Sequence, residues 1–449
     1  MVMSKRVATV RKQHLLGIAL ASILFGFGAC KAHAVTEQAK PADAFVETIG
    51  IGDRFDWLND DGRLPQAQTA INLLHIRYLR VGITAQSGSP TYIANTKAMA
   101  SNIGAKLCIV TDVYNPWSTQ AAWLDSWRAY SGTYAVEGPN EVGSALPTAV
   151  SIQQSLWAYA YPKGMEVYAW TLGGQAGYYN KAASNGGSTV GNYCEYLNFH
   201  PYHWYTNPAS HAASKMNGLW QNGDFDNLGY GTGGCINAVR TMANNPTKPF
   251  VSTEFGWCIN GQENGVSINH AKKYVPRALF ENFNAGMHRG FIFSLTAYAG
   301  AGADYSVASY KNGSLNATGQ AVADTISLLQ EPGHANFAAG ALNYSLTGTA
   351  LAFTDDHNVQ NDEIHHTLLQ KSNGTYYLVL WCDYDSHLGE DGWSQTGTLT
   401  LPDGARSVNA YLPVTNGTSI VTSYGAVSAG GTIRVTIPDH PIILAISGI

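Results

Sequence analysis

The sequence predicts a chain of the α/β class, in which a (β/α)8 TIM barrel is followed by a β-sandwich domain. Up to about residue 330, eight short apolar runs alternate with helical stretches, which is typical of a parallel sheet with crossover helices. Eight strands are the number that closes such a barrel. After Glu331-Pro332-Gly333 the pattern changes to short strands separated by turn residues, which favours a sandwich. We therefore expect the barrel at residues 35–332 and the sandwich at residues 333–449.

The individual barrel elements follow from the spacing of the apolar residues. The expected strands are residues 47–51, 76–83, 106–113, 134–138, 166–172, 196–202, 249–255 and 290–298. Apolar spacings of three and four predict helices at residues 64–75, 89–104, 118–130, 151–161, 268–286 and 318–330. The segment from about Tyr205 to Asn245 is long and rich in Gly and Asn. Because long loops on the active face of a barrel usually carry function, we expect it to wall a substrate cleft.

The first 34 residues have the three parts of a secretory signal peptide. Residues 1–14 carry positive charges, residues 15–29 are apolar, and Ala32-His33-Ala34 offers a small-x-small cleavage site before Val35. The apolar run is short for a membrane span, although an uncleaved N-terminal anchor is the alternative. We expect a secreted or periplasmic protein without a membrane span in its mature chain.

The composition and net charge indicate which classes of binding partner to expect. The chain of 449 residues has a formal net charge of −5, and only 13% of its residues are charged. Beyond the extreme N-terminus it lacks the Lys and Arg clusters with which proteins grip phosphate backbones. We therefore expect a monomeric globular protein that does not bind nucleic acid.

The cysteines leave several pairings open. Cleavage after Ala34 would leave five, which allows at most two disulfides and at least one free thiol: Cys108, Cys194, Cys235, Cys258 and Cys382. The KLCIV context predicts that Cys108 is a buried strand residue. A disulfide between Cys194 and Cys235 would constrain the long loop, but the sequence does not determine the pairing. Neither CxxC nor HExxH occurs, so we expect no metal and no cofactor.

Two glutamates stand out because each follows an apolar run. Glu141 lies in VEGPNEVG after the fourth predicted strand, and Glu254 lies in FVSTEFGW at the end of the seventh. A barrel gathers the C-terminal ends of its strands on one face, where catalytic residues collect. Taken singly, Glu141 could be a carboxylate at a helix start and Glu254 a solvated loop acid. Their matching positions favour a pair of carboxylates that act together.

These motifs resemble those of a known enzyme group. An NE pair after strand four and TEFGW at strand seven look like the signatures of retaining clan A glycoside hydrolases, and the appended sandwich resembles that of family 39 and its relatives, including family 5-like enzymes. The plan of an exported barrel with a C-terminal sandwich is similar to bacterial endoglycosidases that cut exopolysaccharides. The resemblance implies an O-glycosyl hydrolase that uses Glu141 as acid/base, Glu254 as nucleophile and Asn140 to bind the sugar 2-hydroxyl. In a retaining enzyme the carboxyl groups lie about 5 to 5.5 Å apart.

The resemblance also suggests residues around the two carboxylates. Arg80, in YLRVG, resembles the arginine beside the nucleophile; a structural ion pair is the alternative. His200 and Tyr202, in NFHPYHWY, resemble residues that orient the nucleophile, whereas His203 is a weaker candidate. Aromatic faces stack on sugar rings, and four aromatic residues near strand ends are candidate platforms, about half of which we expect in the core: Trp117, Trp204, Trp257 and Tyr298.

Two departures and two alternatives remain. The eighth strand reads FIFSLTAY without the tryptophan that many clan members carry, and the first strand ends in GDRFDW rather than a histidine-bearing turn, so the sugar site is expected to be unusual. The main expectation is a retaining, endo-acting hydrolase of a polysaccharide or oligosaccharide. The alternatives are a non-catalytic carbohydrate-binding or polysaccharide-assembly protein, and a transglycosylase that uses the same residues.

Overall fold

The computed structural model describes residues 35–83, 90–142, 145–172, 187–202, 239–259, 265–297, 302–348, 364–382 and 392–449. The expected signal peptide and most of the long loop that we expect to wall a cleft therefore lie outside the described residues. So does Cys235, and with it the bridge considered for Cys194.

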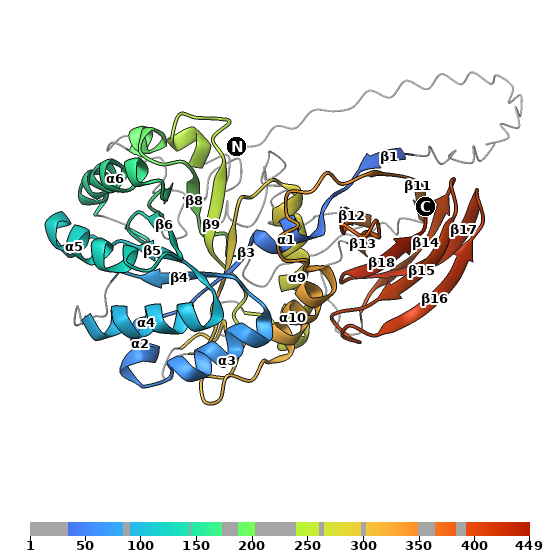
Figure 1. The fold of residues 1–449 in the computed structure, drawn as a ribbon, viewed down its shortest axis with the longest axis horizontal. Helices are drawn as coiled ribbons and strands as arrows, with labels where there is room; N and C mark the ends of the chain where they lie inside the picture. The colour runs from blue at the N-terminus through green and yellow to red at the C-terminus, as the bar shows by residue number, and fades with distance from the viewer. Residues whose placement is uncertain are drawn as a thin grey trace, which may run out of the picture. The chain divides into compact units, whose positions relative to one another are not determined.

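The first body is a barrel of eight parallel strands (Figure 1). Hydrogen-bonded neighbours follow the order β7-β6-β5-β4-β3-β10-β9-β8. An isolated parallel bridge between Tyr168 and Tyr196 joins the two ends of this sheet, so the barrel is nearly closed. The strands are β3 (Ile49–Gly52), β4 (Tyr78–Gly82), β5 (Lys106–Val110), β6 (Thr133–Glu137), β7 (Glu166–Tyr168), β8 (Leu197–Phe199), β9 (Phe250–Phe255) and β10 (Gly290–Phe293).

Helices cover the outside of the barrel, as Figure 1 shows for α3 to α6. Four α-helices begin with a recognisable signal: Pro stands in the first turn of two of them, and the Ser267 and Asn316 side chains cap two others, as is common at helix starts. The elements are α1 (Ala42–Glu47), α2 (Phe55–Asp60), α3 (Leu64–Leu74), α4 (Pro90–Ile103), α5 (Trp117–Arg128), α6 (Leu146–Ala160), η1 (Tyr161–Lys163), η2 (Gly187–Asn192), α9 (Ile268–Asn284) and α10 (Ala317–Leu329).

The second body consists of two mainly antiparallel sheets. Their orders are β1-β11-β14-β17 and β16-β15-β18-β13-β12-β2. Buried side chains from both sheets form one core cluster, for example Leu399 and Val435 from the first and Leu378 and Leu444 from the second. The strands are β1 (Val35–Gln38), β2 (Lys40–Pro41), β11 (Ala341–Gly348), β12 (Ile364–Gln370), β13 (Tyr376–Cys382), β14 (Ser394–Leu401), β15 (Ala405–Tyr411), β16 (Ile420–Val427), β17 (Gly431–Pro438) and β18 (Ile442–Ser447).

Helix α9 connects the barrel to the sheets. The rings of Phe280 on α9 and Trp381 on β13 stack with centroids 5.8 Å apart, and Trp381 belongs to the same hydrophobic cluster as the barrel core. Lys273 Nζ lies 2.8 Å from Asp439 Oδ2. The chain's first strands also cross over, because β1 pairs with β11 and β2 with β12. Residues 35–41 thus belong to the sheets, although they precede the barrel in sequence.

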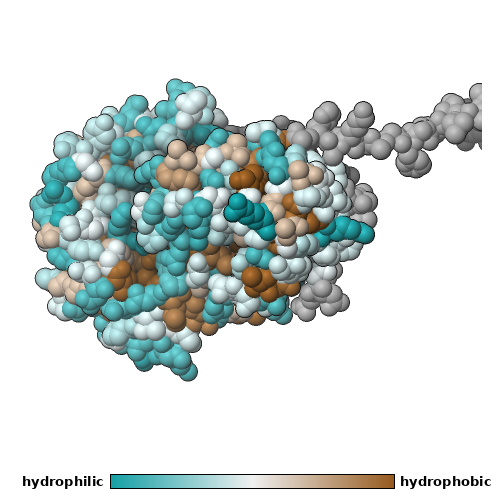
Figure 2. Space-filling view, turned by 45° about the vertical axis from the view of Figure 1, so that its right-hand side comes forward, coloured by the Kyte–Doolittle hydropathy of each residue, from teal (hydrophilic) through white to brown (hydrophobic). Residues whose placement is uncertain are grey.

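Two surface properties complete the description. Among the described residues, no helix is both long and apolar enough to cross a bilayer. Figure 2 shows one face of the molecule, on which hydrophilic residues predominate and hydrophobic ones form separate patches.

Candidate active site

Four barrel strands bring the candidate residues to one face. Arg80 lies within β4 and Glu254 is the fifth residue of β9, whereas His200 directly follows β8. Glu141 comes four residues after the end of β6. Since all eight strands are parallel, these positions meet at the C-terminal face of the barrel.

Glu254 is a buried carboxylate held at both oxygens. Its Oε1 accepts a hydrogen bond from Arg80 Nη1 at 2.5 Å, and its Oε2 accepts one from the Tyr202 hydroxyl at 2.6 Å. Burial raises the pKa of Glu254, but the nearby His200 and Arg80 and the hydrogen bonds from Tyr202 and Arg80 outweigh burial and lower that pKa below its usual value. These contacts keep the carboxylate ionised and fixed in orientation.

Glu141 has a different environment. Its side chain is 39% exposed, against 10% for Glu254. Its Oε1 lies 3.0 Å from His200 Nδ1, and its backbone N–H donates to the Thr171 hydroxyl at 3.0 Å. The backbone φ of Glu141 is +43°, a left-handed conformation that is uncommon outside Gly and that clusters at functional sites.

The two carboxyl groups are close together. One ligand atom from each of Glu141, His200 and Glu254 forms a group in which all atoms lie within 4.8 Å of one another. A carboxylate oxygen of Glu141 therefore lies within 4.8 Å of one of Glu254. This separation is close to the spacing of about 5 to 5.5 Å at which one carboxyl group acts on the leaving oxygen and the other on the anomeric carbon.

Arg80 links the nucleophile candidate to two further residues. Its Nε and Nη2 donate to the two oxygens of Glu137 at 2.6 and 2.9 Å, and Nη2 also donates to Asn140 Oδ1 at 2.6 Å. Burial alone would lower the pKa of Arg80, but the carboxylates of Glu137 and Glu254 raise it above its usual value. The guanidinium is a permanent cation between two carboxylates.

Three buried polar residues of the site were not predicted from the sequence: Glu137, Asn198 and Thr253. Thr253 Oγ1 lies 2.9 Å from Glu137 Oε1 and 2.9 Å from His200 Nε2, and Asn198 Nδ2 donates to it at 2.8 Å. All three are at most 2% exposed. A signal was available, because each is a polar residue within or at the end of a predicted strand that is largely buried, where an unpaired polar group would be costly.

The structure brings together most of the sequence candidates. Glu141, Glu254, Asn140, Arg80, His200 and Tyr202 form one connected cluster. His203, Trp204 and Tyr298 lie outside the described residues.

The two described platform candidates pack against other aromatic side chains. Trp257 is 2% exposed and packs against Tyr274 in the barrel core, so its ring faces are not accessible to a sugar. Trp117 opens helix α5, where it is partly buried and meets Tyr159 edge to face.

Asp53 is a further acidic residue at the C-terminal face of the barrel. It directly follows β3, and its Oδ2 accepts hydrogen bonds from the backbone N–H and the hydroxyl of Thr296 at 2.9 and 2.8 Å. Burial raises the pKa of Asp53 to about 6, against the effect of these hydrogen bonds. It occupies the GDRFDW turn, the first-strand position at which the sequence departs from the family resemblance.

The cluster also contains the elements of a metal site. Glu141, His200 and Glu254 offer two carboxylates and an imidazole, a ligand set that suits zinc. However, Arg80 and Tyr202 already occupy the two oxygens of Glu254, and the charge of the guanidinium opposes a second cation there. The donor set therefore fits the work of an acid and a nucleophile better than that of a metal centre.

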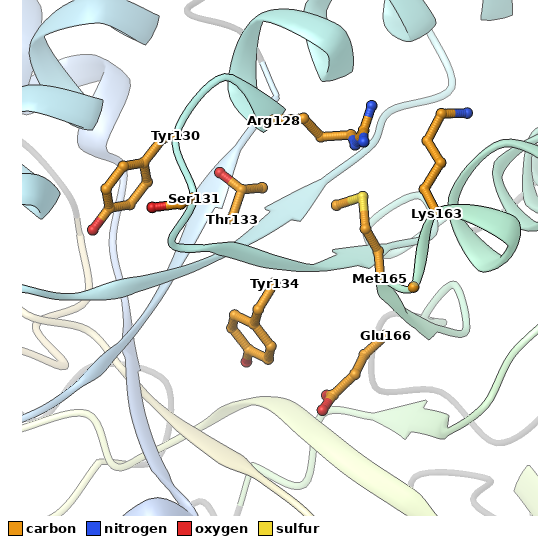
Figure 3. A pocket seen from close by; sticks show the side chains of 9 residues that line it. Arg128, Tyr130, Ser131, Thr133, Tyr134, Lys163, Met165 and Glu166 are labelled. Atoms are coloured by element: carbon orange, nitrogen blue, oxygen red, sulfur yellow. The ribbon is translucent and has the colours of Figure 1, made fainter.

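A separate hollow lies at the opposite end of the barrel. Its volume is about 390 Å³, and it is lined where β6 and β7 begin. Figure 3 shows Arg128 and Lys163 on one side of the strand ribbon and Tyr134 and Glu166 on the other. Several of these groups are already engaged: Lys163 donates to the Tyr159 carbonyl and Glu166 accepts from Tyr168. Because it lies where the strands begin, this hollow is not part of the carboxylate site at their C-terminal ends.

Comparison with known proteins supports the fold. No family model and no curated protein matches the chain. Among solved structures, it is similar to a GH39 enzyme from Xanthomonas axonopodis pv. citri (10% identity, TM-score 0.53, 92% of this chain and 96% of that one). It is also similar to a monomeric beta-xylosidase from Caulobacter crescentus CB15 (10% identity, TM-score 0.56, 92% and 98%). The predicted barrel with a C-terminal sandwich is confirmed, and the resemblance to family 39 is confirmed at the level of the fold.

Proposed function

We propose that the protein is a retaining glycoside hydrolase that cleaves an O-glycosidic bond of a polysaccharide or oligosaccharide by double displacement. The observation that carries this proposal is the pair Glu141 and Glu254, in which one oxygen of each carboxyl group lies within 4.8 Å of the other and the two environments contrast. One carboxyl group must be protonated and the other ionised for this chemistry. The ionic contacts of Glu254 suit the nucleophile, and the more exposed Glu141 suits the acid/base.

The first step transfers the sugar to the protein. Glu254 Oε attacks the anomeric carbon while the bond from that carbon to the leaving oxygen breaks, and Glu141 gives its proton to that oxygen. The leaving group departs as an alcohol, and a glycosyl ester remains on Glu254. Glu141 is now a carboxylate.

The second step releases the sugar. Glu141 takes a proton from a water molecule, whose oxygen attacks the anomeric carbon as the ester bond breaks. Glu254 leaves as a carboxylate, stabilised again by Arg80 and Tyr202. Two inversions return the original anomeric configuration.

Asn140 is placed to hold the sugar during both steps. Its Oδ1 accepts from Arg80, and among the described residues Nδ2 has no acceptor within hydrogen-bond distance. We assign Nδ2 as the donor to the sugar 2-hydroxyl, an interaction that strengthens in the transition state. Export to the periplasm or the exterior and attack within a polysaccharide chain are part of the proposal and rest on the sequence.

The test is a substrate panel with matched variants. We expect purified protein to hydrolyse at least one member of a set of polysaccharides and aryl glycosides, and aryl β-xylosides belong in it because a fold neighbour is a beta-xylosidase. Proton NMR should show the anomer of retained configuration as the first product. Glu141→Gln and Glu254→Gln should each lose nearly all hydrolysis, whereas Glu166→Gln, at the opposite end of the barrel, should keep it.

Three outcomes separate the alternatives. Inverted product would overturn the retaining mechanism. Sugar binding without turnover across the whole panel would indicate a carbohydrate-binding protein instead. Longer products from an oligosaccharide donor would indicate transglycosylation.

A further inference from the structure

Thr253 lies at the centre of a hydrogen-bond network that reaches both carboxylates. Its hydroxyl oxygen has polar atoms of three residues within 3.0 Å: Glu137 Oε1 at 2.9 Å, Asn198 Nδ2 and Oδ1 at 2.8 and 3.0 Å, and His200 Nε2 at 2.9 Å. A hydroxyl can donate one hydrogen and accept two. The identity of each neighbour therefore decides which way each hydrogen points.

Glu137 receives the single hydrogen of the hydroxyl. Its carboxylate accepts two N–H bonds from Arg80, so it is ionised and can only accept. If Thr253 donated elsewhere, its oxygen would face a carboxylate oxygen at 2.9 Å without a hydrogen between them. Such a contact is strongly unfavourable at a fully buried position.

Asn198 takes one of the two acceptor sites. Its orientation is fixed, because Oδ1 accepts from the backbone N–H of Thr253 at 3.1 Å and Nδ2 donates to the carbonyl of Ala169 at 3.1 Å. With Nδ2 donating to Thr253, only one lone pair of the hydroxyl remains. His200 Nε2 must therefore carry a hydrogen and donate it to Thr253.

The other ring nitrogen faces the acid/base. His200 Nδ1 lies 3.0 Å from Glu141 Oε1 and 3.7 Å from Glu254 Oε2. With Nε2 protonated, the neutral ring presents a bare lone pair at Nδ1. That lone pair can accept if Glu141 holds a proton; in the imidazolium form the same proton lies on Nδ1, which donates it to an ionised Glu141.

We propose that Thr253, oriented by Glu137, is a positioning residue that fixes His200 in its Nε2–H form and so holds the proton of the acid/base on the Nδ1–Glu141 hydrogen bond. Loss of that proton would leave the Nδ1 lone pair facing a carboxylate oxygen at 3.0 Å, which is repulsive. The network thereby keeps Glu141 ready to donate. This inference rests on the proposed function for its kinetic consequences, but not for the state of the ring.

Other charged groups around this hydrogen bond are Glu254 on β9 and Arg80 on β4, joined at 2.5 Å. Tyr202 donates to Glu254, and Glu137 is linked to His200 through Thr253. Because Arg80 and Glu254 form an ion pair with each other, the network reaches the acid/base through the hydrogen bond between His200 and Glu141.

The critical variant is Thr253→Val, which has nearly the same shape but lacks the hydroxyl. Without an acceptor at Nε2, the His200 ring can move its hydrogen to Nδ1 and donate it to an ionised Glu141. The basic limb of the pH profile of kcat/KM should then move to lower pH by about one unit, the size expected for one hydrogen bond to a charged group. Thr253→Ser should return the basic limb to its wild-type pH. Ser252→Ala, which removes a buried hydroxyl from the adjacent position of β9, should leave the limb in place.

The leaving group distinguishes proton control from a general disturbance. At pH values above the basic limb, Thr253→Val should lose about tenfold in kcat/KM on an unactivated oligosaccharide, which corresponds to that one-unit shift. On a dinitrophenyl glycoside, whose leaving group needs no protonation, the loss should stay below about twofold, because general acid catalysis is not used. Equal losses on both substrates with an unmoved limb would overturn the proposal.

A direct readout does not depend on activity. With 15N-labelled histidine, and with His200→Asn to assign the signal, NMR of the wild-type chain should show Nε2 protonated throughout the pH range in which the chain stays folded. A wild-type ring protonated at Nδ1 alone would refute the proposal, even if Thr253→Val did not fold. If the ring has the expected form but no substrate is hydrolysed, the proposed function fails and the network stands.

Discussion

Glu254 and Glu141 have the same side chain in different surroundings, and this contrast matches the separate roles that we propose for them. Glu254 is 10% exposed and is bound by a guanidinium and a phenol, whereas Glu141 is 39% exposed and faces one imidazole nitrogen. An ionised nucleophile and a proton donor have opposite requirements. The site meets both within a few ångströms.

Tyr202→Phe tests the contribution of the phenol to the nucleophile. Removing the hydroxyl deletes a hydrogen bond that helps to lower the pKa of Glu254. The folded pKa should rise, so the acidic limb of the pH profile of kcat/KM should move to higher pH, by about one unit. The measurement is the pH dependence of hydrolysis of an aryl glycoside.

A matched substitution controls for the loss of a phenol. Tyr196 precedes β8, whereas Tyr202 follows it. Tyr196 thus lies at the other end of the barrel, where it stacks on His288. Tyr196→Phe should leave the acidic limb where it is. An unmoved limb in Tyr202→Phe would show that Arg80 and His200 suffice to keep Glu254 ionised.

The sequence indicated part of this site and missed the rest for a physical reason. Glu141 and Glu254 were predictable because they end or follow apolar runs, and Arg80, His200 and Tyr202 because they resemble a family motif. Glu137, Asn198 and Thr253 lie in or at the end of predicted strands, where they were not predicted as site residues. Their partners are distant in sequence, for example 116 positions between Glu137 and Thr253, so their pairing requires the closed barrel.

At the level of elements, the predicted strands were confirmed at their starts more than at their ends. The run at 166–172 forms a strand only as far as Tyr168, because Trp170 N then donates to the side chain of Gln153 and Thr171 N to the carbonyl of Pro139. The run at 290–298 stops at Phe293, after which Ser294 N donates to the carbonyl of Tyr305. These backbone N–H groups therefore donate to acceptors outside the sheet. The periodicity of apolar residues does not predict such partners.

The contact between α9 and the sheets should make stability depend on pH. Burial raises the pKa of Asp439, but hydrogen bonds and charge from His440 and Lys273 outweigh it and lower the pKa to about 2. A carboxyl group with a lowered folded pKa stabilises the fold above its unfolded pKa and loses that effect as pH falls through the folded one. We expect about 2 kcal/mol of unfolding free energy to be lost between about pH 4 and pH 2.

Asp439→Asn tests this contact by urea denaturation at several pH values. The variant should be less stable at pH 7 and should show a flatter dependence of stability below pH 4. Because Lys273 would remain buried without its partner, we expect the loss at neutral pH to reach about 3 kcal/mol. The double variant Lys273→Met/Asp439→Asn should recover part of it. An unchanged acid profile would assign the pH dependence to other carboxylates.

At the scale of the whole molecule, the barrel is not expected to be a separable unit. It shares a hydrophobic cluster with the sheets, which includes Trp381, Val379 and Ile443. We predict that residues 35–332, expressed alone, will not unfold cooperatively and will not hydrolyse a substrate that residues 35–449 hydrolyse. Circular dichroism during heating measures the first property. A sharp transition in the shorter chain would contradict the prediction.

The pairing of β1 with β11 also has a consequence for the timing of maturation. Gln38 pairs with Ala341, so β1 can join its sheet only after the ribosome has synthesised a partner about 300 residues later in the chain. Val35, the residue that the expected cleavage would expose, is itself paired, with Tyr344. A signal peptidase needs the backbone around Ala34 and Val35 in extended, unpaired form, and the completed sheet competes for the same backbone. A leader cleaved at the expected site would therefore have to be processed before the sheet closes, and a chain that folds first would retain it.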